Sequence, residues 1–190
     1  MKLSKIADVS VGIILSRKQD RLHKNNIYTY NSITLKSVQG SGVINKDDLE
    51  KVFFKYAIEE ELLTQKGDVV IRLSEPYISA YIDESLTRLV VPSNFAIIRL
   101  FDKNINGEFL KFYLNSNSGK KAILKVSGGS NLNTINITNL KQIEIKNLDE
   151  EKQKKFIEIN RLFIKEEMLL TALIDEKRKY LNNVNKIILE

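Results

Sequence analysis

Residues 150–189 read EEKQKKFIEINRLFIKEEMLLTALIDEKRKYLNNVNKIIL and contain neither Gly nor Pro. Apolar residues recur in this stretch with a helical period, which predicts one continuous helix roughly 60 Å long at about 1.5 Å per residue. With Phe156 at position a of a heptad, eight of the ten a and d positions are apolar or aromatic. The a positions are Phe156, Phe163, Leu170, Lys177 and Val184, and the d positions are Ile159, Glu166, Leu173, Tyr180 and Ile187.

A helix of this length can fold back on its own domain or extend from it as an arm that pairs with another chain. Because the preceding residues cannot bury so long an apolar stripe along its whole length, we expect an exposed coiled-coil arm over residues 149–190. Glu166 and Lys177 interrupt the apolar seam, and polar residues at such positions commonly set register and orientation. In an antiparallel pair of identical helices, Glu166 of one chain can face Lys177 of the other.

The start of the helix is marked by capping residues. Asn147, followed three residues later by Glu150, fits a capping box, which places the helix start near residue 149. Negative charge at Asp149, Glu150 and Glu151 suits the positive end of the helix dipole. Residues 1–148 therefore form a separate globular domain.

Composition excludes several classes of protein. The chain has no Cys and one His, so disulfides, thiolate metal sites and Cys-His catalysis are excluded. The single His23 lies in a basic run and is interpreted as a surface residue. No P-loop, dinucleotide or S-adenosylmethionine motif is present, so we expect a protein without catalytic activity, metal or cofactor. No apolar run is long enough to span a membrane and no signal-peptide core is present, so we expect a cytoplasmic protein.

The net charge of +6 is uneven along the chain. Residues 149–190 hold nine basic and nine acidic side chains, so the domain carries the whole excess. Within the domain, residues 1–36 have seven Lys and Arg against two Asp, and residues 111–146 have six Lys against one Glu. If the fold brings both basic stretches to one face, that face is suited to a polyanion, with nucleic acid the first candidate; the alternative is a scattered basic surface.

The domain mixes strand and helix patterns, so we predict an α+β fold. Strands are expected near residues 27–30, 69–73, 77–82, 89–91, 95–100 and 140–145, where β-branched, aromatic and other apolar residues gather. A turn is expected at residues 40–42, and a short helix or irregular loop at 47–57. Helical spacing predicts helices at 108–115 and 118–126.

Several segments resemble, in order and spacing, a specificity subunit of a type I restriction-modification system. They are Lys66-Gly67-Asp68-Val69-Val70-Ile71-Arg72, the stretches 91–100 and 109–116, Gly128-Gly129-Ser130, and 140–145 just before the long helix. The family's Pro-Pro pair at the last junction is replaced by Asn147-Leu148-Asp149, and of the Glu-Gln that follows only Gln153 matches.

The resemblance implies that residues 1–148 form a target-recognition domain that binds double-stranded DNA. Such subunits carry two of these domains, each followed by a helix, and the two helices pair antiparallel. This chain has one of each, which implies a homodimer through residues 149–190 that positions methyltransferase and endonuclease subunits of a type I or related fused system. The alternative is a coiled-coil interaction module that pairs with a full-length specificity subunit and modulates assembly without reading DNA.

Candidate DNA-contacting residues combine cations for phosphates with polar groups for base edges. The first basic stretch supplies Arg17, Lys18, Arg21 and Lys24, with Tyr28 or Tyr30 adjoining. The end of the strand that resembles the family supplies Arg72, Ser74 and Tyr77. The second basic stretch supplies Lys120, Lys121 and Lys125, with Asn131 and Asn133 in the loop beyond.

Overall fold

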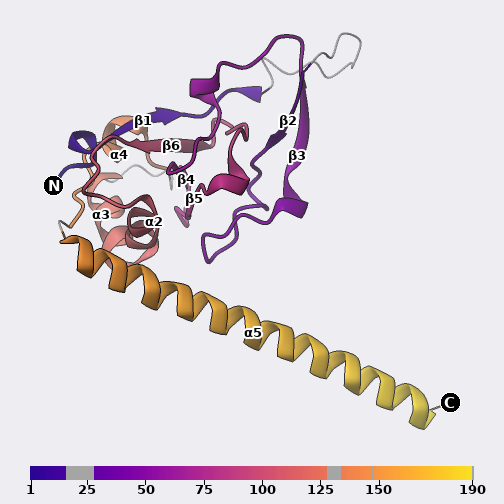
Figure 1. The fold of residues 1–190 in the computed structure, drawn as a ribbon. Coiled ribbons are helices and arrows are strands. Elements are labelled where there is room, and N and C mark those ends of the chain that lie inside the picture. Colours follow the sequence, from indigo (N-terminus) through magenta and orange to yellow (C-terminus); the bar gives the residue numbers. More distant parts are fainter. Residues whose placement is uncertain (16–27, 128–133, 147, 190) are drawn as a thin grey trace.

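The computed structural model describes residues 1–15, 28–127, 134–146 and 148–189, and has an α+β domain followed by one long helix (Figure 1). This confirms the predicted fold class. Among the described residues the domain contains a four-stranded and a two-stranded sheet.

The four-stranded sheet is antiparallel in the order β1-β6-β4-β5, with β1 at Ala7–Val11, β6 at Phe95–Leu100, β4 at Val69–Arg72 and β5 at Ser79–Tyr81. Its central strands are apolar on both faces, as the sequence of 69–71 and 95–98 predicted. Val69 and Ile71 face the core beneath the helices, whereas Val70 packs into the core on the other face. Because side chains alternate along a strand, this one sheet organises both cores.

The two-stranded sheet, here called the ribbon, pairs β2 at Tyr28–Ser32 with β3 at Glu50–Phe54 (Figure 1). The prediction of a helix or irregular loop at 47–57 is wrong beyond the short 3-10 turn Lys46–Asp48, which Asn45 caps. Val52 and Phe54 alternate into the small core around Leu63 and Val90, so burial with period two decides the strand.

The helical part of the domain comprises α2 at Gly107–Asn115, α3 at Asn117–Ser127 and the single turn α4 at Ile137–Leu140. The predicted helices at 108–115 and 118–126 are confirmed. Asn106 caps α2, since its side-chain oxygen accepts from the N–H groups of Glu108 and Phe109.

The predicted strand at 140–145 is wrong in extent. α4 occupies its first residue, and the segment that follows makes only one isolated bridge, between Lys2 and Glu144. The Leu3 N–H donates to Ile143 O at 2.8 Å, and the Ile145 N–H donates to Met1 O at 2.7 Å. The segment therefore fastens the beginning of the chain to the domain.

The helix α5 runs from Glu150 to Leu189, so the predicted long helix is confirmed. Asp149 is its N-cap, because its Oδ1 accepts from the Lys152 N–H at 2.8 Å; Asn147, predicted for that role, lies outside the described residues. Only the first part of α5 lies against the domain, and beyond it the helix runs past the edge of the domain (Figure 1). Within the described residues no helix is long and apolar enough to cross a membrane.

One buried ion pair holds the turn before β4 to β6. Asp68, buried, accepts from Arg99 Nε at 2.9 Å and Nη2 at 2.8 Å, and from the Gln65 N–H at 2.8 Å. The hydrogen bonds that Arg99 donates to Asp68 raise the pKa of Arg99. Arg99 also donates to the carbonyl oxygens of Glu61 and Leu63, so it ties three segments together.

We expect Asp68→Asn to lower the free energy of unfolding by about 2 to 3 kcal/mol, because it breaks a charged, hydrogen-bonded pair that is largely removed from water. Urea denaturation measures this loss. The control is Lys66→Met, which removes the exposed ion pair with Glu84. It should change the free energy of unfolding by no more than about 0.5 kcal/mol. Equal effects of the two variants would contradict the assignment.

Candidate functional site

The predicted pairing seam is largely exposed on α5. Leu170 is 54% exposed and Tyr180 is 72% exposed, and the polar seam residues Glu166 and Lys177 are exposed as well. Phe156 differs, because its ring contacts Phe109 of α2 edge-on, with centroids 5.7 Å apart. Val184 is half-buried, and the remaining seam residues are exposed: Ile159, Phe163, Leu173 and Ile187.

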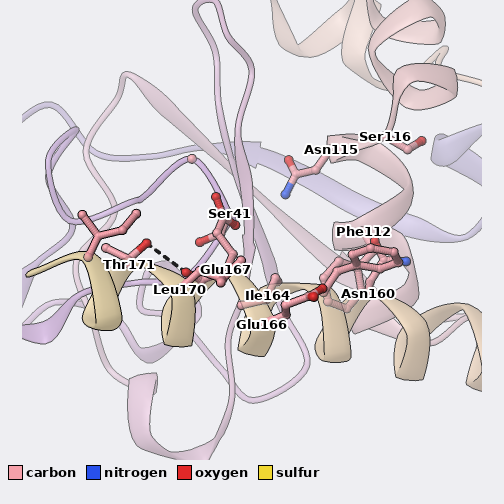
Figure 2. A pocket seen from close by; sticks show the side chains of 13 residues that line it. Ser41, Phe112, Asn115, Ser116, Asn160, Ile164, Glu166, Glu167, Leu170 and Thr171 are labelled. Carbon is pink, nitrogen blue, oxygen red and sulfur yellow. Dashed lines mark hydrogen bonds between the residues drawn. The ribbon is translucent and has the colours of Figure 1, made fainter. Parts of the chain in front are cut away.

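A groove of about 480 Å³ separates α5 from the domain (Figure 2). The 40–41 turn and the C-terminal end of α2, with Phe112 and Asn115, form one wall, and α5 forms the other with Ile164, Glu166 and Leu170. The predicted turn at 40–42 is present. On α5, Leu170 and Phe163 belong both to this groove and to an apolar strip that includes Ile159, Leu162, Leu169 and Leu173.

The joint between the domain and α5 is centred on Gln153, which is 2% exposed. Its Oε1 accepts from the Asn106 N–H at 2.9 Å, and its Nε2 donates to Asn104 O at 2.8 Å and Leu148 O at 2.9 Å. About two turns further along, Arg161 donates to both carboxylate oxygens of Glu108 on α2. Ile157 is buried beside them.

Sequence reasoning noted Gln153 only as a match to the family, and it missed Glu108 and Arg161. These partners are 53 residues apart in the chain, so no local spacing connects them. The local signal for Gln153 is weak: it precedes Phe156 and Ile157 by three and four residues, which places a polar residue on the helix face of these apolar side chains.

The second basic stretch lies beside the N-terminus. Lys125 and Lys146 line a groove of about 470 Å³ with Met1, and Lys2 Nζ donates to Gln142 Oε1 at 2.8 Å. On α3, Lys121 and Lys125 are exposed and Lys120 is half-buried. Among the described residues, none of the lysines at 120, 121 and 125 forms an ion pair.

The two basic stretches meet only in part. Lys2 and Lys5 lie near residues 141–145, because the Ser4 N–H donates to Lys141 O at 3.0 Å. The candidates Arg17, Lys18, Arg21 and Lys24 lie outside the described residues. Tyr28, where the described chain resumes in β2, lies across the domain from α3 (Figure 1).

The candidates at the end of β4 lie close together. Arg72 Nε donates to Ser74 Oγ at 3.0 Å, and Ser74 forms an isolated bridge with Thr134, beyond which the candidates Asn131 and Asn133 lie outside the described residues. Tyr77 is buried in the core, and burial raises the pKa of its hydroxyl. Arg72 and Ser74 therefore offer polar groups at the surface, whereas Tyr77 supports the loop from inside.

Lys111 of α2 is an unusual buried cation near the groove. It is 4% exposed, its Nζ lies 3.8 Å from the centroid of the Phe112 ring, and no carboxylate of the described residues forms an ion pair with it. Burial lowers its pKa to about 8. Gly42, at a φ of 74°, packs against the methylene chain of Lys111. A Cβ at position 42 would lie 2.6 Å from Lys111 Cε and 2.4 Å from Ser79 O.

Among the described residues, no three His, Cys, Asp or Glu side chains gather into a group that could hold a metal ion. The features that the structure does present are an exposed apolar seam, basic surfaces on the domain and a rigid joint between them. This arrangement suits binding and positioning.

The solved structures that share this fold include three from type I restriction-modification systems. The HsdS subunit from Thermoanaerobacter tengcongensis aligns with a TM-score of 0.66 at 14% identity, over 94% of this chain and 45% of that chain. A chain from a structure that addresses complex assembly and conformational transition of the type I R-M system aligns with a TM-score of 0.61 at 14% identity, over 94% and 43%. The type I restriction-modification S subunit from M. genitalium aligns with a TM-score of 0.57 at 16% identity, over 94% and 42%.

No family model and no curated protein matches the sequence. The chain has the fold of a type I restriction-modification specificity subunit, so the resemblance found in the sequence is confirmed for the fold. It spans under half the length of the solved chains that it matches.

We expect Lys111→Met to raise the free energy of unfolding at pH 7 by about 1 to 3 kcal/mol, because the buried ammonium is costly. The folded-state pKa of about 8 lies below the unfolded value of 10.5, so the unfolded state binds more protons between these values. The free energy of unfolding of the wild type should therefore rise between pH 8 and 10.5. The difference in this free energy between the wild type and Lys111→Met should shrink over the same range.

Urea denaturation at pH 7 and pH 10 measures both stabilities. Lys121→Met is the matched control, since it removes an exposed lysine from the neighbouring helix. Parallel pH profiles of the wild type and Lys111→Met would show that the Lys111 ammonium is not destabilised by burial.

Proposed function

We propose that this chain is a DNA-specificity module of a type I or related restriction-modification system. In this proposal residues 1–148 form the target-recognition domain, and α5 pairs two copies so that two domains read a bipartite site. Methyltransferase and endonuclease subunits would act on the DNA that the dimer holds. The observation that carries the proposal is the fold shared with specificity subunits over 94% of this chain, combined with the exposed apolar seam of α5.

The seam itself favours an antiparallel homodimer. When Glu166 faces Lys177 of a second copy, the same register places Leu170 opposite Leu173 and Phe163 opposite Tyr180. Ile159 then faces Val184, and Phe156 faces Ile187. Every a position meets a d position, and the two polar layers, which the two-fold axis relates, each join opposite charges. A two-fold axis through this pair presents two identical domains in inverted orientation.

The exposure of α5 supports pairing on energetic grounds. Burying one Leu, Ile or Phe side chain completely is worth about 1.5 to 3 kcal/mol, and the seam and its flanks expose many of them. The charge distribution points the same way, because a neutral arm allows two copies to approach while the basic domains remain available for DNA.

The chain contains no Cys, so disulfide cross-linking can test the register. We expect a mixture of Glu166→Cys and Lys177→Cys chains, carrying tags of different size, to form a covalent heterodimer on oxidation. Either variant alone should not, because identical positions would lie about 16 Å apart along the axis, too far for a disulfide. Gel electrophoresis separates the products.

Glu167→Cys mixed with Lys177→Cys is the matched control, since residue 167 lies off the seam and should not cross-link. Covalent homodimers of the Glu166→Cys chain alone would instead indicate a parallel pair and would contradict the antiparallel register.

Sequencing the duplexes that the wild type retains from a random pool tests DNA reading. We expect a two-part site with inverted halves. Lys125→Glu should weaken binding to all duplexes and lower the slope of log affinity against log salt by about 0.9 if Lys125 contacts one phosphate. Lys103→Glu makes the same charge change at another exposed position and should have a smaller effect.

Two results would redirect the proposal. A chain that forms a dimer or joins a specificity subunit yet binds every duplex equally would favour the interaction module, which modulates assembly without reading DNA. Equal effects of Lys125→Glu and Lys103→Glu would remove α3 from the DNA-binding face.

A further inference from the structure

The ribbon of β2 and β3 is a separate feature at the side of the domain away from α3 (Figure 1). Its register places Asn31 directly opposite Lys51, and Thr29 opposite Phe53. The base of the ribbon is fixed to the core, because the Val90 N–H donates to Asn31 O at 2.9 Å and the Ile33 N–H donates to Val90 O at 2.9 Å. Asn31 therefore stands on a rigid backbone.

The two faces of the ribbon differ. Val52, Phe54 and Tyr30 lie on the inner face and pack into the small core. Because side chains alternate across a strand, Asn31 and Lys51 lie on the outer face, and both are exposed. Thr29 shares this face. Glu50 is the only acidic residue of the two strands, and it lies on the same face as Val52, opposite the face of Lys51. No carboxylate of the ribbon therefore lies beside the Lys51 ammonium.

The outer polar groups lack partners among the described residues. In that part of the chain, the side chain of Asn31 makes no hydrogen bond and Lys51 makes no ion pair, so both are free to bind a ligand from solvent. Lys55, two residues after Phe53, is also exposed and lies 5.2 Å from the centroid of the Tyr56 ring. The face thus offers amide, hydroxyl and ammonium groups for a polar ligand.

The dimensions of the ribbon suit duplex DNA. The major groove, about 12 Å wide, admits a two-stranded β-ribbon. Residues two apart on one strand are about 6.8 Å apart, which matches two base steps of about 3.4 Å, so Thr29 and Asn31 can follow the bases of one strand. Asn pairs with adenine through N6 and N7, and Lys binds O6 and N7 of guanine.

We propose that the outer face of the ribbon reads base edges in the major groove, with Asn31 and Lys51 as specificity-determining residues. This inference rests on the proposed function and adds a reading surface that differs from the candidates at Arg72, Ser74 and α3. Asn31 contacts adenine, and Lys51 on the opposing strand contacts a neighbouring guanine.

The test compares duplexes enriched from a random pool by wild type, Asn31→Ala and Lys51→Ala, and then measures affinity for the best wild-type site and for an unrelated duplex. Each variant should lose preference at its own position in both half-sites. Affinity of Asn31→Ala for the best site should fall about 5- to 150-fold, while its affinity for the unrelated duplex stays unchanged. Asn182→Ala removes an exposed Asn from α5 outside the seam and should keep the full motif.

Thermal unfolding establishes that the variants remain folded. If the wild type enriches a site and both ribbon variants enrich the same site with unchanged affinity, the ribbon is not the reading surface and the proposed function stands. Uniform weakening by Lys51→Ala with an unchanged motif would overturn the role of Lys51 in specificity. A wild type that enriches no sequence overturns both the ribbon and the DNA-specificity function.

Discussion

The buried amide of Gln153 is the interaction on which the arrangement of domain and helix depends. Its three hydrogen bonds satisfy backbone groups of the 104–106 turn and of Leu148, groups that would otherwise be unpaired away from water. Phe156 and Ile157 add apolar contacts with the domain, and Arg161 forms a bidentate ion pair with Glu108 of α2. Polar bonds with fixed directions, set within apolar packing, fix the direction of α5 more tightly than apolar contact alone could.

A rigid joint has a consequence for the rest of α5. Beyond the groove beside Leu170 and Ile174, the helix contacts little of the described domain, although its apolar side chains continue to Ile187. An isolated helix gains little stability from its backbone alone, which supports the proposal that the apolar face of α5 packs against a second copy. The domain packs against the first turns of α5, and the exposed seam beyond them is suited to the proposed partner.

How much the sequence could predict follows from the strength of each local pattern. Three elements carry their signals within a few residues, so the sequence predicts their type correctly. They are α5 with its helical period, β4 with the apolar run 69–71, and α2, which Asn106 caps. At 47–57, Leu49, Val52, Phe53 and Tyr56 fit a helical period, whereas Val52 and Phe54 fit the period of a strand, and only pairing with β2 decides for a strand. The joint and the outer face of the ribbon could not be predicted, because Glu108 with Arg161, and Asn31 with Lys51, meet only through tertiary structure.

The joint at Gln153 and the seam of α5 together set the distance between the two domains of the proposed dimer, which can be compared with a distance along DNA. In the register that places Glu166 against Lys177, Gln153 of one chain lies level with residue 190 of the other. The two joints are then about 37 residues apart along the helices, which is about 55 Å at about 1.5 Å per residue. That distance equals about 16 base pairs at about 3.4 Å each. Because each domain is held rigidly at its joint, a shift of one heptad in register moves each joint by about 10 Å relative to its partner, or about three base pairs. In the proposed dimer, the register of the seam would set the spacing of the half-sites, whereas the domain would set the bases within each half.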